Sequence, residues 1–317
     1  MTFPPPRFLR HDGFDLALYE AGPKDGVPLI LIHGWPEMAY SWSNQIGPLS
    51  GAGYRVIAMD VRGFGRSSAP QGLHHYEISQ IVSDVEAVLD DIGAEQAVLI
   101  GHDWGGIIVW HAARMLSTRI SHVISLCTPH VKRAPADPIK IFRTRHGDEH
   151  YFVHFHDQPG RADALFASDP ESFFRLMFEP IEKGTEITSE MFHTPARFQA
   201  FLREARISVP SIVPEKDLQV YVEAYRKSGF HGGLNLYRNT TANWELAEGL
   251  SSTIAQPVLM ISAQDDVFLP PAFSDPMVDM VPNLTRHIVE DCGHWIMWEK
   301  PDAINAHIIG WLGRQVG

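Results

Sequence analysis

The sequence predicts an α/β fold in which a mostly parallel central sheet is flanked by helices and carries an inserted helical cap. Short β-branched runs alternate with amphipathic helical patterns in the first part of the chain and again near its end, an order typical of a parallel sheet covered by helices. Between these parts, the alternation gives way to a long helical and aromatic stretch interrupted by prolines. With 317 residues, of which 44% are apolar, the chain can bury a large core. We therefore expect one globular unit with an inserted subdomain.

The predicted elements follow in chain order. Strands are expected at residues 27–32, 54–60, 97–100, 123–128, 257–263 and 287–289, and helices at 78–92, 105–116 and 301–311. These elements place the core in residues 1–133 and 248–317. Residues 134–247 are expected to form the cap, over the edge of the sheet where open α/β folds bind their ligands. The cap should therefore cover the functional site.

Composition and charge disfavour several classes of protein. A formal net charge of −12 argues against nucleic acid and anionic membranes as partners, because both would require a clustered basic face. Cys127 and Cys292 lie far apart in apolar stretches and do not indicate a disulfide framework. No run of about 18 apolar residues is present, so we expect a cytoplasmic protein. We also expect a monomer or homodimer that acts on a small neutral molecule. Because no extension precedes the predicted core, we expect no fused second enzyme domain.

A tight turn between a strand and a helix carries the candidate nucleophile. The strand at 97–100 runs into Gly101-His102-Asp103-Trp104-Gly105 and then into a helix, which is the shape of a nucleophile elbow with aspartate where esterases have serine. A Cβ at Gly101 or Gly105 would collide with neighbouring backbone. Alone, Asp103 would be an ordinary helix N-cap. As a nucleophile, a carboxylate that attacks an sp³ carbon forms an ester that water can hydrolyse, so Asp103 predicts ring opening or halide displacement.

A candidate base and its orienting acid follow near the C-terminus. His294 comes just after the strand at 287–289, which places it on a loop at the sheet edge as the natural general base. Its partner is expected in the loop after the strand at 257–263, where Asp265 and Asp266 are adjacent. This gives the chain order nucleophile, acid, histidine. A lone loop histidine is usually structural, but the order and spacing favour catalysis here.

With these motifs, the chain resembles the epoxide hydrolases of the α/β-hydrolase fold from about Phe14 to Trp311. Residues 33–37, His-Gly-Trp-Pro-Glu, are similar to the family's His-Gly-x-Pro segment. The resemblance implies that the backbone N–H groups of Trp35 and Trp104 form an oxyanion hole and that the Trp35–Pro36 peptide is cis. The segment that ends in the family's catalytic acid matches at Asp266, which is why we choose Asp266 over its neighbour.

The resemblance also implies a pair of cap tyrosines that bind and protonate the epoxide oxygen. Tyr237 lies directly before Arg238 in a segment that looks very like the family's second tyrosine segment. Tyr151 is similar to the first, although the following run, Phe-His-Asp-Gln-Pro-Gly, has one residue more than the family pattern. Because of that difference, His154 is the alternative oxygen-binding group.

The implied reaction converts an epoxide to a vicinal diol through an ester on Asp103, which is hydrolysed by water that His294 and Asp266 activate. The epoxide and water are the only reactants, and neither a cofactor nor a metal ion is expected. The residues expected to contact the substrate are Trp35, Pro36, Trp104, Phe152, His154 and Trp295.

The nearest alternative is a haloalkane dehalogenase, which shares the fold, the aspartate nucleophile and the tryptophan after it. Such enzymes hold the departing halide with indole or amide N–H donors. The sequence has no tryptophan between Trp110 and Trp244, and Trp35 stands where some dehalogenases have asparagine. A fluoroacetate dehalogenase would have arginine in place of Trp104. The tyrosine pair has no role in halide release and favours an epoxide hydrolase.

Two other classes of protein match parts of the sequence. His146, His150 and His154 have the i, i+4, i+8 spacing of one helix face and could hold a metal ion. The segment lacks the glutamate of a zinc-protease helix, and histidines at that spacing can equally line a solvated helix face. A non-catalytic ligand receptor should have lost part of the catalytic set, whereas all five predicted catalytic residues are present. We therefore expect an enzyme.

Overall fold

The computed structural model describes residues 3–148, 150–180, 199 and 210–315 and contains an eight-stranded sheet in the order β1-β2-β4-β3-β5-β6-β7-β8. Strands β3 to β8 are parallel, whereas β2 runs antiparallel to both β1 and β4. The predicted mostly parallel sheet is thus confirmed. The strands are β1 Arg7–His11, β2 Phe14–Ala21, β3 Pro28–Ile32, β4 Arg55–Met59, β5 Ala97–His102, β6 Ile120–Leu126, β7 Val258–Ala263 and β8 Leu284–Val289.

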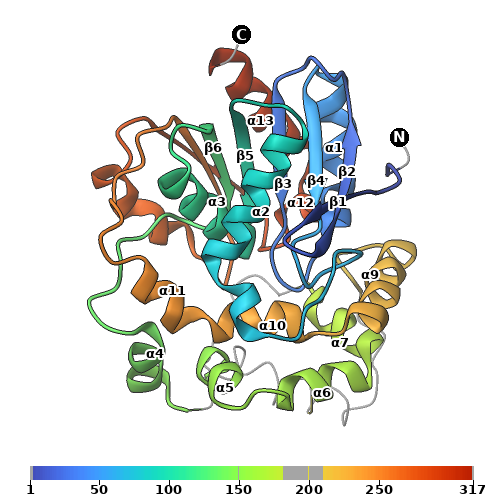
Figure 1. Cartoon of the computed structure of the whole chain (residues 1–317), viewed down its shortest axis with the longest axis vertical. Coiled ribbons are helices and arrows are strands. Elements are labelled where there is room, and N and C mark those ends of the chain that lie inside the picture. Colours follow the sequence, from blue (N-terminus) through green and yellow to red (C-terminus); the bar gives the residue numbers. More distant parts are fainter. Residues whose placement is uncertain (1–2, 149, 181–198, 200–209, 316–317) are drawn as a thin grey trace.

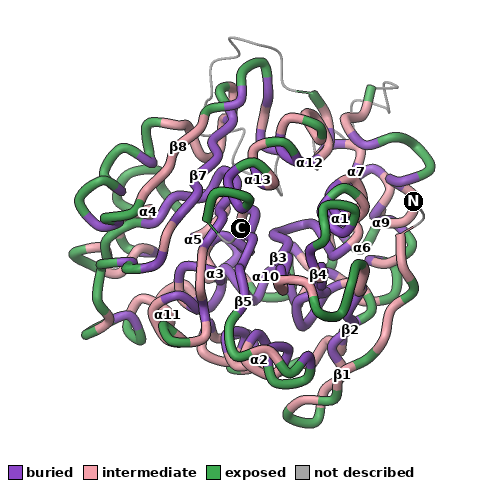
Figure 2. Tube along the Cα trace, turned by 90° about the horizontal axis from the view of Figure 1, so that it is seen from above, coloured by how far each residue is buried: buried purple, intermediate pink, exposed green. Residues whose placement is uncertain are grey.

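Helices cover both faces of the sheet (Figures 1 and 2). Successive strand residues point to opposite faces. Ile30 and Ile32 of β3 therefore pack in the core cluster that holds the apolar sides of α2 and α3, whereas Leu29 and Leu31 pack with α1 and α13. These helices, with their short neighbours, are η1 Ala39–Trp42, α1 Ser43–Gly51, η2 Leu73–Tyr76, α2 Ile78–Asp91, α3 Trp104–Met115, η4 Pro271–Asp279, α12 Ile296–Glu299 and α13 Pro301–Gln315.

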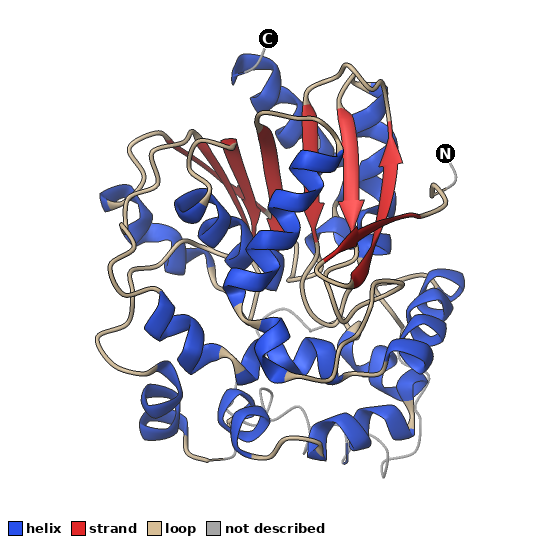
Figure 3. Ribbon diagram, in the orientation of Figure 1, coloured by secondary structure: helices blue, strands red, loops and turns tan. Residues whose placement is uncertain are grey.

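A layer of helices lies beyond the carboxyl ends of the parallel strands (Figure 3). All of them come from the segment between β6 and β7, where the sequence predicts the helical insertion. The core cluster on the α2 and α3 side of the sheet continues into this layer, because it includes Phe155, Phe166 and Tyr237. The described helices of the layer are α4 Pro138–His146, α5 Tyr151–Asp157, α6 Arg161–Ser168, α7 Pro170–Met177, α9 Glu215–Ser228, α10 His231–Arg238 and α11 Thr240–Leu246.

The sequence analysis missed β1, β2 and the first half of β8. Both β1 and β8 are edge strands whose side chains are mostly half-exposed, so they lack the apolar run that marks a strand buried on two faces.

None of the described helices combines the length and the apolar composition needed to cross a membrane.

Candidate active site

Asp103 lies at the sharp turn between β5 and α3. Its backbone has φ 51° and ψ −120°, a region that non-glycine residues rarely adopt and that costs about 1–3 kcal/mol. The predicted need for glycine is confirmed, since a Cβ at Gly101 would lie 2.3 Å from the carbonyl oxygen of Gly105 and a Cβ at Gly105 would lie 2.0 Å from that of Ile32. The turn presents the Asp103 carboxylate to a cavity under the helical layer.

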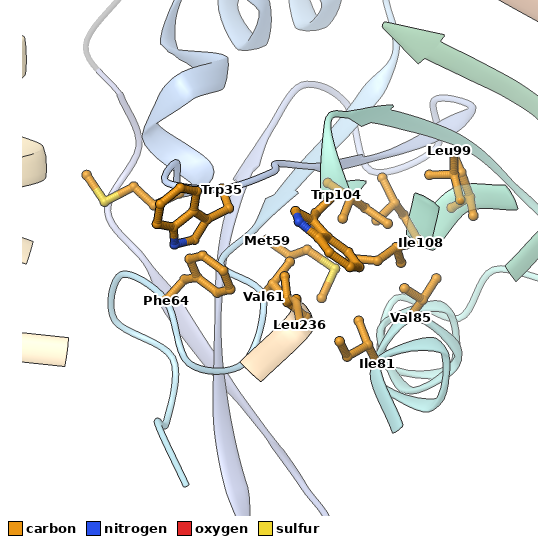
Figure 4. Packing of buried hydrophobic residues seen from close by; sticks show 14 of the residues in the cluster. Trp35, Met59, Val61, Phe64, Ile81, Val85, Leu99, Trp104, Ile108 and Leu236 are labelled. Atoms are coloured by element: carbon orange, nitrogen blue, oxygen red, sulfur yellow. The ribbon is translucent and has the colours of Figure 1, made fainter. Parts of the chain in front are cut away.

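One carboxylate oxygen of Asp103 is held by the loop after β3. The backbone N–H of Trp35 donates a hydrogen bond to Asp103 Oδ1 at 2.8 Å. This approach requires Gly34, because a Cβ there would lie 2.4 Å from the Asp103 side chain. The Trp35–Pro36 peptide is cis, as the resemblance implied. Figure 4 shows the Trp35 and Trp104 side chains on either side of apolar residues that include Val61 and Leu236, so both side chains rest on one core.

The predicted base and acid meet beside the other oxygen. His294 Nδ1 lies 2.8 Å from Asp266 Oδ2, and His294 Nε2 lies 3.8 Å from Asp103 Oδ2. The second oxygen of Asp266 accepts the backbone N–H groups of Phe268 and Leu269, both at 2.9 Å. With Nδ1 bound to the Asp266 carboxylate, His294 directs Nε2 toward Asp103. Asp266, and not its neighbour, is therefore the aspartate that contacts the histidine.

The charges in this group are strongly coupled. Burial alone would lower the pKa of His294, but the carboxylates of Asp266 and Asp103 raise it to about 9. Burial raises the pKa of Asp266, but the adjacent imidazolium outweighs it and holds that pKa below its usual value. Burial raises the pKa of Asp103, and His294 and the N–H groups of Trp35 and Trp104 oppose that rise. The two carboxylates therefore favour the protonated form of His294 at neutral pH.

Two tyrosines from the helical layer line the same cavity as the Asp103 carboxylate. Tyr151 is the first residue of α5 and Tyr237 lies in α10, and their ring centroids are 5.7 Å apart. The Tyr237 ring also packs edge-on against Trp104 at 4.9 Å. Burial and the nearby Asp103 charge raise the pKa of both hydroxyls, so both stay protonated and can donate hydrogen bonds into the cavity.

The cavity has a volume of about 580 Å³ and mostly apolar walls. Four of the predicted contact residues line it, but Pro36 and His154 are not among its described lining residues. An apolar run that the sequence analysis did not assign, Val267 to Pro270 with Phe273, forms one wall directly after Asp266. The lining residues are Trp35, Asp103, Trp104, Ile107, Thr128, Phe142, His146, His150, Tyr151, Phe152, Met177, Tyr237, Val267, Phe268, Leu269, Pro270, Phe273, His294 and Trp295.

Comparison with known proteins identifies the family. The family described as alpha/beta hydrolase fold matches residues 27–301. Epoxide hydrolase A of Mycobacterium tuberculosis is 34% identical over 98% of both chains. The crystal structure of epoxide hydrolase A from Mycobacterium thermoresistibile matches with a TM-score of 0.87, at 34% identity and 98% coverage of both chains. The chain belongs to the epoxide hydrolases.

A mammalian member of the family extends the comparison. Mouse bifunctional epoxide hydrolase 2 is 37% identical over 96% of this chain, which spans 54% of the mouse protein. These relatives favour the epoxide hydrolase interpretation over the haloalkane dehalogenase alternative.

The histidine row that suggested a metal site does not form one helix face. Helix α4 ends at His146, Gly147 takes a φ of 82°, and α5 begins only at Tyr151. His146 and His150 stack on each other in the cavity wall, with ring centroids 4.9 Å apart, whereas His154 is buried outside that wall. The expectation of an i, i+4, i+8 row is therefore wrong, because the glycine breaks the helix between the first two histidines.

A buried pair behind the histidine loop was missed by the sequence analysis, although both residues lie inside motifs that it quoted. His102 Nδ1 lies 2.7 Å from Glu37 Oε2, and its Nε2 lies 2.9 Å from the carbonyl oxygen of His294. Glu37 also accepts the backbone N–H of Gly34 at 3.3 Å. Burial raises the pKa of Glu37, but His102 outweighs it and lowers that pKa. The pair thus connects the loop that carries Trp35 to the loop that carries His294.

The charge on Asp103 is expected to contribute to the raised pKa of His294. An Asp103→Asn substitution removes a nearby negative charge that stabilises the imidazolium, so the pKa of His294 should fall below its value of about 9 in the unmodified protein. Histidine ring NMR shifts followed against pH would measure the change, with Asp265→Asn as the matched control. An unchanged His294 titration in the Asp103→Asn protein would contradict the coupling.

Proposed function

We propose that the chain converts epoxides to vicinal diols through an ester on Asp103. The observation that carries this proposal is the placement of an anchored carboxylate and two protonated tyrosines in the lining of one mostly apolar cavity. A substrate uses all of these groups only if it needs a nucleophile that attacks carbon and an acid that protonates oxygen. An epoxide is such a substrate. Residues 134–247 are taken as the cap that supplies the tyrosines.

In the first half of the reaction, Asp103 Oδ2 attacks one ring carbon while Oδ1 keeps its bond to the Trp35 N–H. The ring C–O bond breaks, and its electron pair stays on the epoxide oxygen. Tyr151 and Tyr237 hydrogen-bond this oxygen, and one hydroxyl gives it a proton, leaving a tyrosinate that is reprotonated later in the cycle. Trp35, Trp104, Phe152 and Trp295 surround the substrate carbons, a role that their place in the cavity wall supports.

In the second half, water attacks the ester carbonyl carbon of Asp103. Esterification removes the negative charge of Asp103, so the pKa of His294 falls and His294 gives its Nε2 proton, through water, to the tyrosinate. Neutral Nε2 can then accept a proton from the attacking water. The negative charge that develops on Oδ1 meets the Trp35 N–H, which already binds this oxygen in the free protein, and the N–H of Trp104. The ester C–O bond then breaks, and the diol oxygen takes the proton from His294. The Asp103 carboxylic acid formed in this way gives its proton to His294, which restores the carboxylate and the imidazolium.

Charge and cysteine chemistry support the wider setting. A net charge of −12 favours a neutral substrate over a polyanionic partner. Cys127 and Cys292 are buried free thiols, which fits a reducing compartment such as the cytoplasm. We propose that the enzyme works there as a monomer or homodimer.

The two tyrosines give the sharpest test of substrate class. Purified protein would be offered aryl, alkyl and fatty epoxides beside 1-haloalkanes, with diol and halide measured for wild type, Tyr151→Phe and Tyr237→Phe. Each substitution removes one oriented acid, so kcat/KM for epoxides should fall by about 10²-fold or more. Tyr54→Phe, a tyrosine in the cluster on the other face of the sheet, should leave turnover unchanged. Halide release without diol formation would refute the proposal.

A further inference from the structure

Arg238 follows Tyr237 in α10, yet its side chain is directed away from the cavity. Arg238 is 8% exposed and is not among the described residues that line the cavity. Its Nε donates to the carbonyl oxygen of Phe155 at 3.0 Å, and its Nη1 donates to Asn235 Oδ1 at 2.9 Å. Its two terminal nitrogens also form an ion pair with the carboxylate of Asp163. The guanidinium thus bonds to Phe155, Asn235 and Asp163. A position next to Tyr237 in the sequence would not by itself require these contacts.

These contacts join the two helices that carry the tyrosines. Phe155 lies in the last turn of α5, the helix that begins at Tyr151, so the bond to its carbonyl fixes α5 against α10. Asp163 in turn accepts the backbone N–H of Gly160 at 3.0 Å, which holds the turn between α5 and α6. One buried side chain therefore connects α10 to the end of α5 and to the start of α6.

The packing of Tyr237 depends on the position of α5. The Tyr237 ring centroid lies 5.7 Å from that of Tyr151, 4.9 Å from that of Phe152 and 5.3 Å from that of Phe155. A shift of α5 along α10 would move one hydroxyl relative to the other. Because a displacement of about 1 Å at a reacting group can cost about 10²-fold in rate, small changes in this contact matter.

Arginine suits this place for a physical reason. Its planar guanidinium directs separate N–H groups to the Phe155 carbonyl and to a carboxylate at the same time, whereas a lysine ammonium is a point charge on a flexible stem. A lysine at position 238 could keep the ion pair with Asp163 but not the whole set of bonds. The charge and the geometry of the contact can therefore be separated experimentally.

We propose that Arg238, held by Asp163, is a positioning residue that sets the spacing of the Tyr151 and Tyr237 hydroxyls and so acts on ring opening alone. This inference rests on the proposed function, in which the tyrosines serve only the first half of the reaction. Ester hydrolysis uses His294, Asp266 and backbone N–H groups of the core, and no described hydrogen bond of Arg238 reaches them. A change at Arg238 should therefore separate the two half-reactions.

The test measures the two rate constants separately. In single-turnover experiments with an epoxide that the wild type accepts, rapid quenching and mass spectrometry would follow formation and decay of the ester in wild type, Arg238→Lys and Asp163→Asn. The rate constant of ring opening should fall about 10- to 100-fold in both variants. The rate constant of ester hydrolysis should stay within about two-fold of wild type. Arg175→Lys is the matched control. This cap arginine pairs with Glu171 and Glu215, which lie far from either tyrosine in the sequence.

A merely structural role gives a different result. If Arg238 only stabilises the fold, both rate constants will fall together or neither will change, and either outcome overturns the inference. Asp163→Asn keeps the shape of the side chain. If Arg238→Lys does not fold, the two rate constants of Asp163→Asn decide between the positioning role and the structural role. Failure of the proposed function is distinguishable, because the wild type itself would then form no ester with any epoxide.

Discussion

Replacing His294 with glutamine is expected to give an enzyme that opens one epoxide per active site and then stops. The glutamine amide can still donate to Asp266, but it cannot take the proton from water, so the ester on Asp103 accumulates. Loss of an oriented base should lower kcat by about 10²- to 10⁴-fold. Intact-protein mass spectrometry after mixing with epoxide should show a mass gain of one substrate molecule, and a peptide map should place it on Asp103.

His74→Gln is the control for this variant, because His74 is an exposed histidine outside the cavity lining. It should turn over like the wild type and show no adduct. Multiple turnovers at the wild-type rate by a pure His294→Gln protein would contradict the two-step scheme.

Replacing Asp103 with alanine should abolish both diol formation and the mass gain. Asp103 is the only carboxylate among the described residues that line the cavity, so kcat should fall by at least about 10⁴-fold. Product analysis over long incubations, with thermal unfolding as a check of the fold, would measure this. Asp265→Ala should keep wild-type activity. Residual turnover within about ten-fold of wild type would mean that another group is the nucleophile.

Most strands of the sheet that are buried on both faces could be predicted from the sequence. β3, β4, β5 and β7 appear in the sequence as continuous apolar runs, and the structure confirms them to within two residues. The edge strands β1 and β8 were missed or shortened because solvent replaces one of their neighbours. Strand β2 was missed although it lies between β1 and β4 and its middle is buried. The broken helix at Gly147 shows a second cause, since regular spacing of histidines says nothing about the backbone between them.

The candidate site was predictable only in part. The need for glycine around Asp103 follows from local geometry, and the structure confirms it. The choice between Asp265 and Asp266 could not be made from their own residues, because it depends on which side chain the loop after β7 turns toward a histidine on the loop after β8. Likewise, the partnership of Glu37 with His102 joins segments far apart in sequence, and no short motif reports it.

The covalent ester on Asp103 is the central claim, and a single turnover in ¹⁸O-labelled water tests it most directly. Enzyme in excess over epoxide would be quenched after one cycle, and both the diol and the peptide that contains Asp103 would be analysed by mass spectrometry. If water attacks the ester carbonyl, the ¹⁸O enters the Asp103 carboxylate and the first diol carries none. Label in the diol with an unlabelled Asp103 would show that water attacks the epoxide directly, and the covalent mechanism would be wrong.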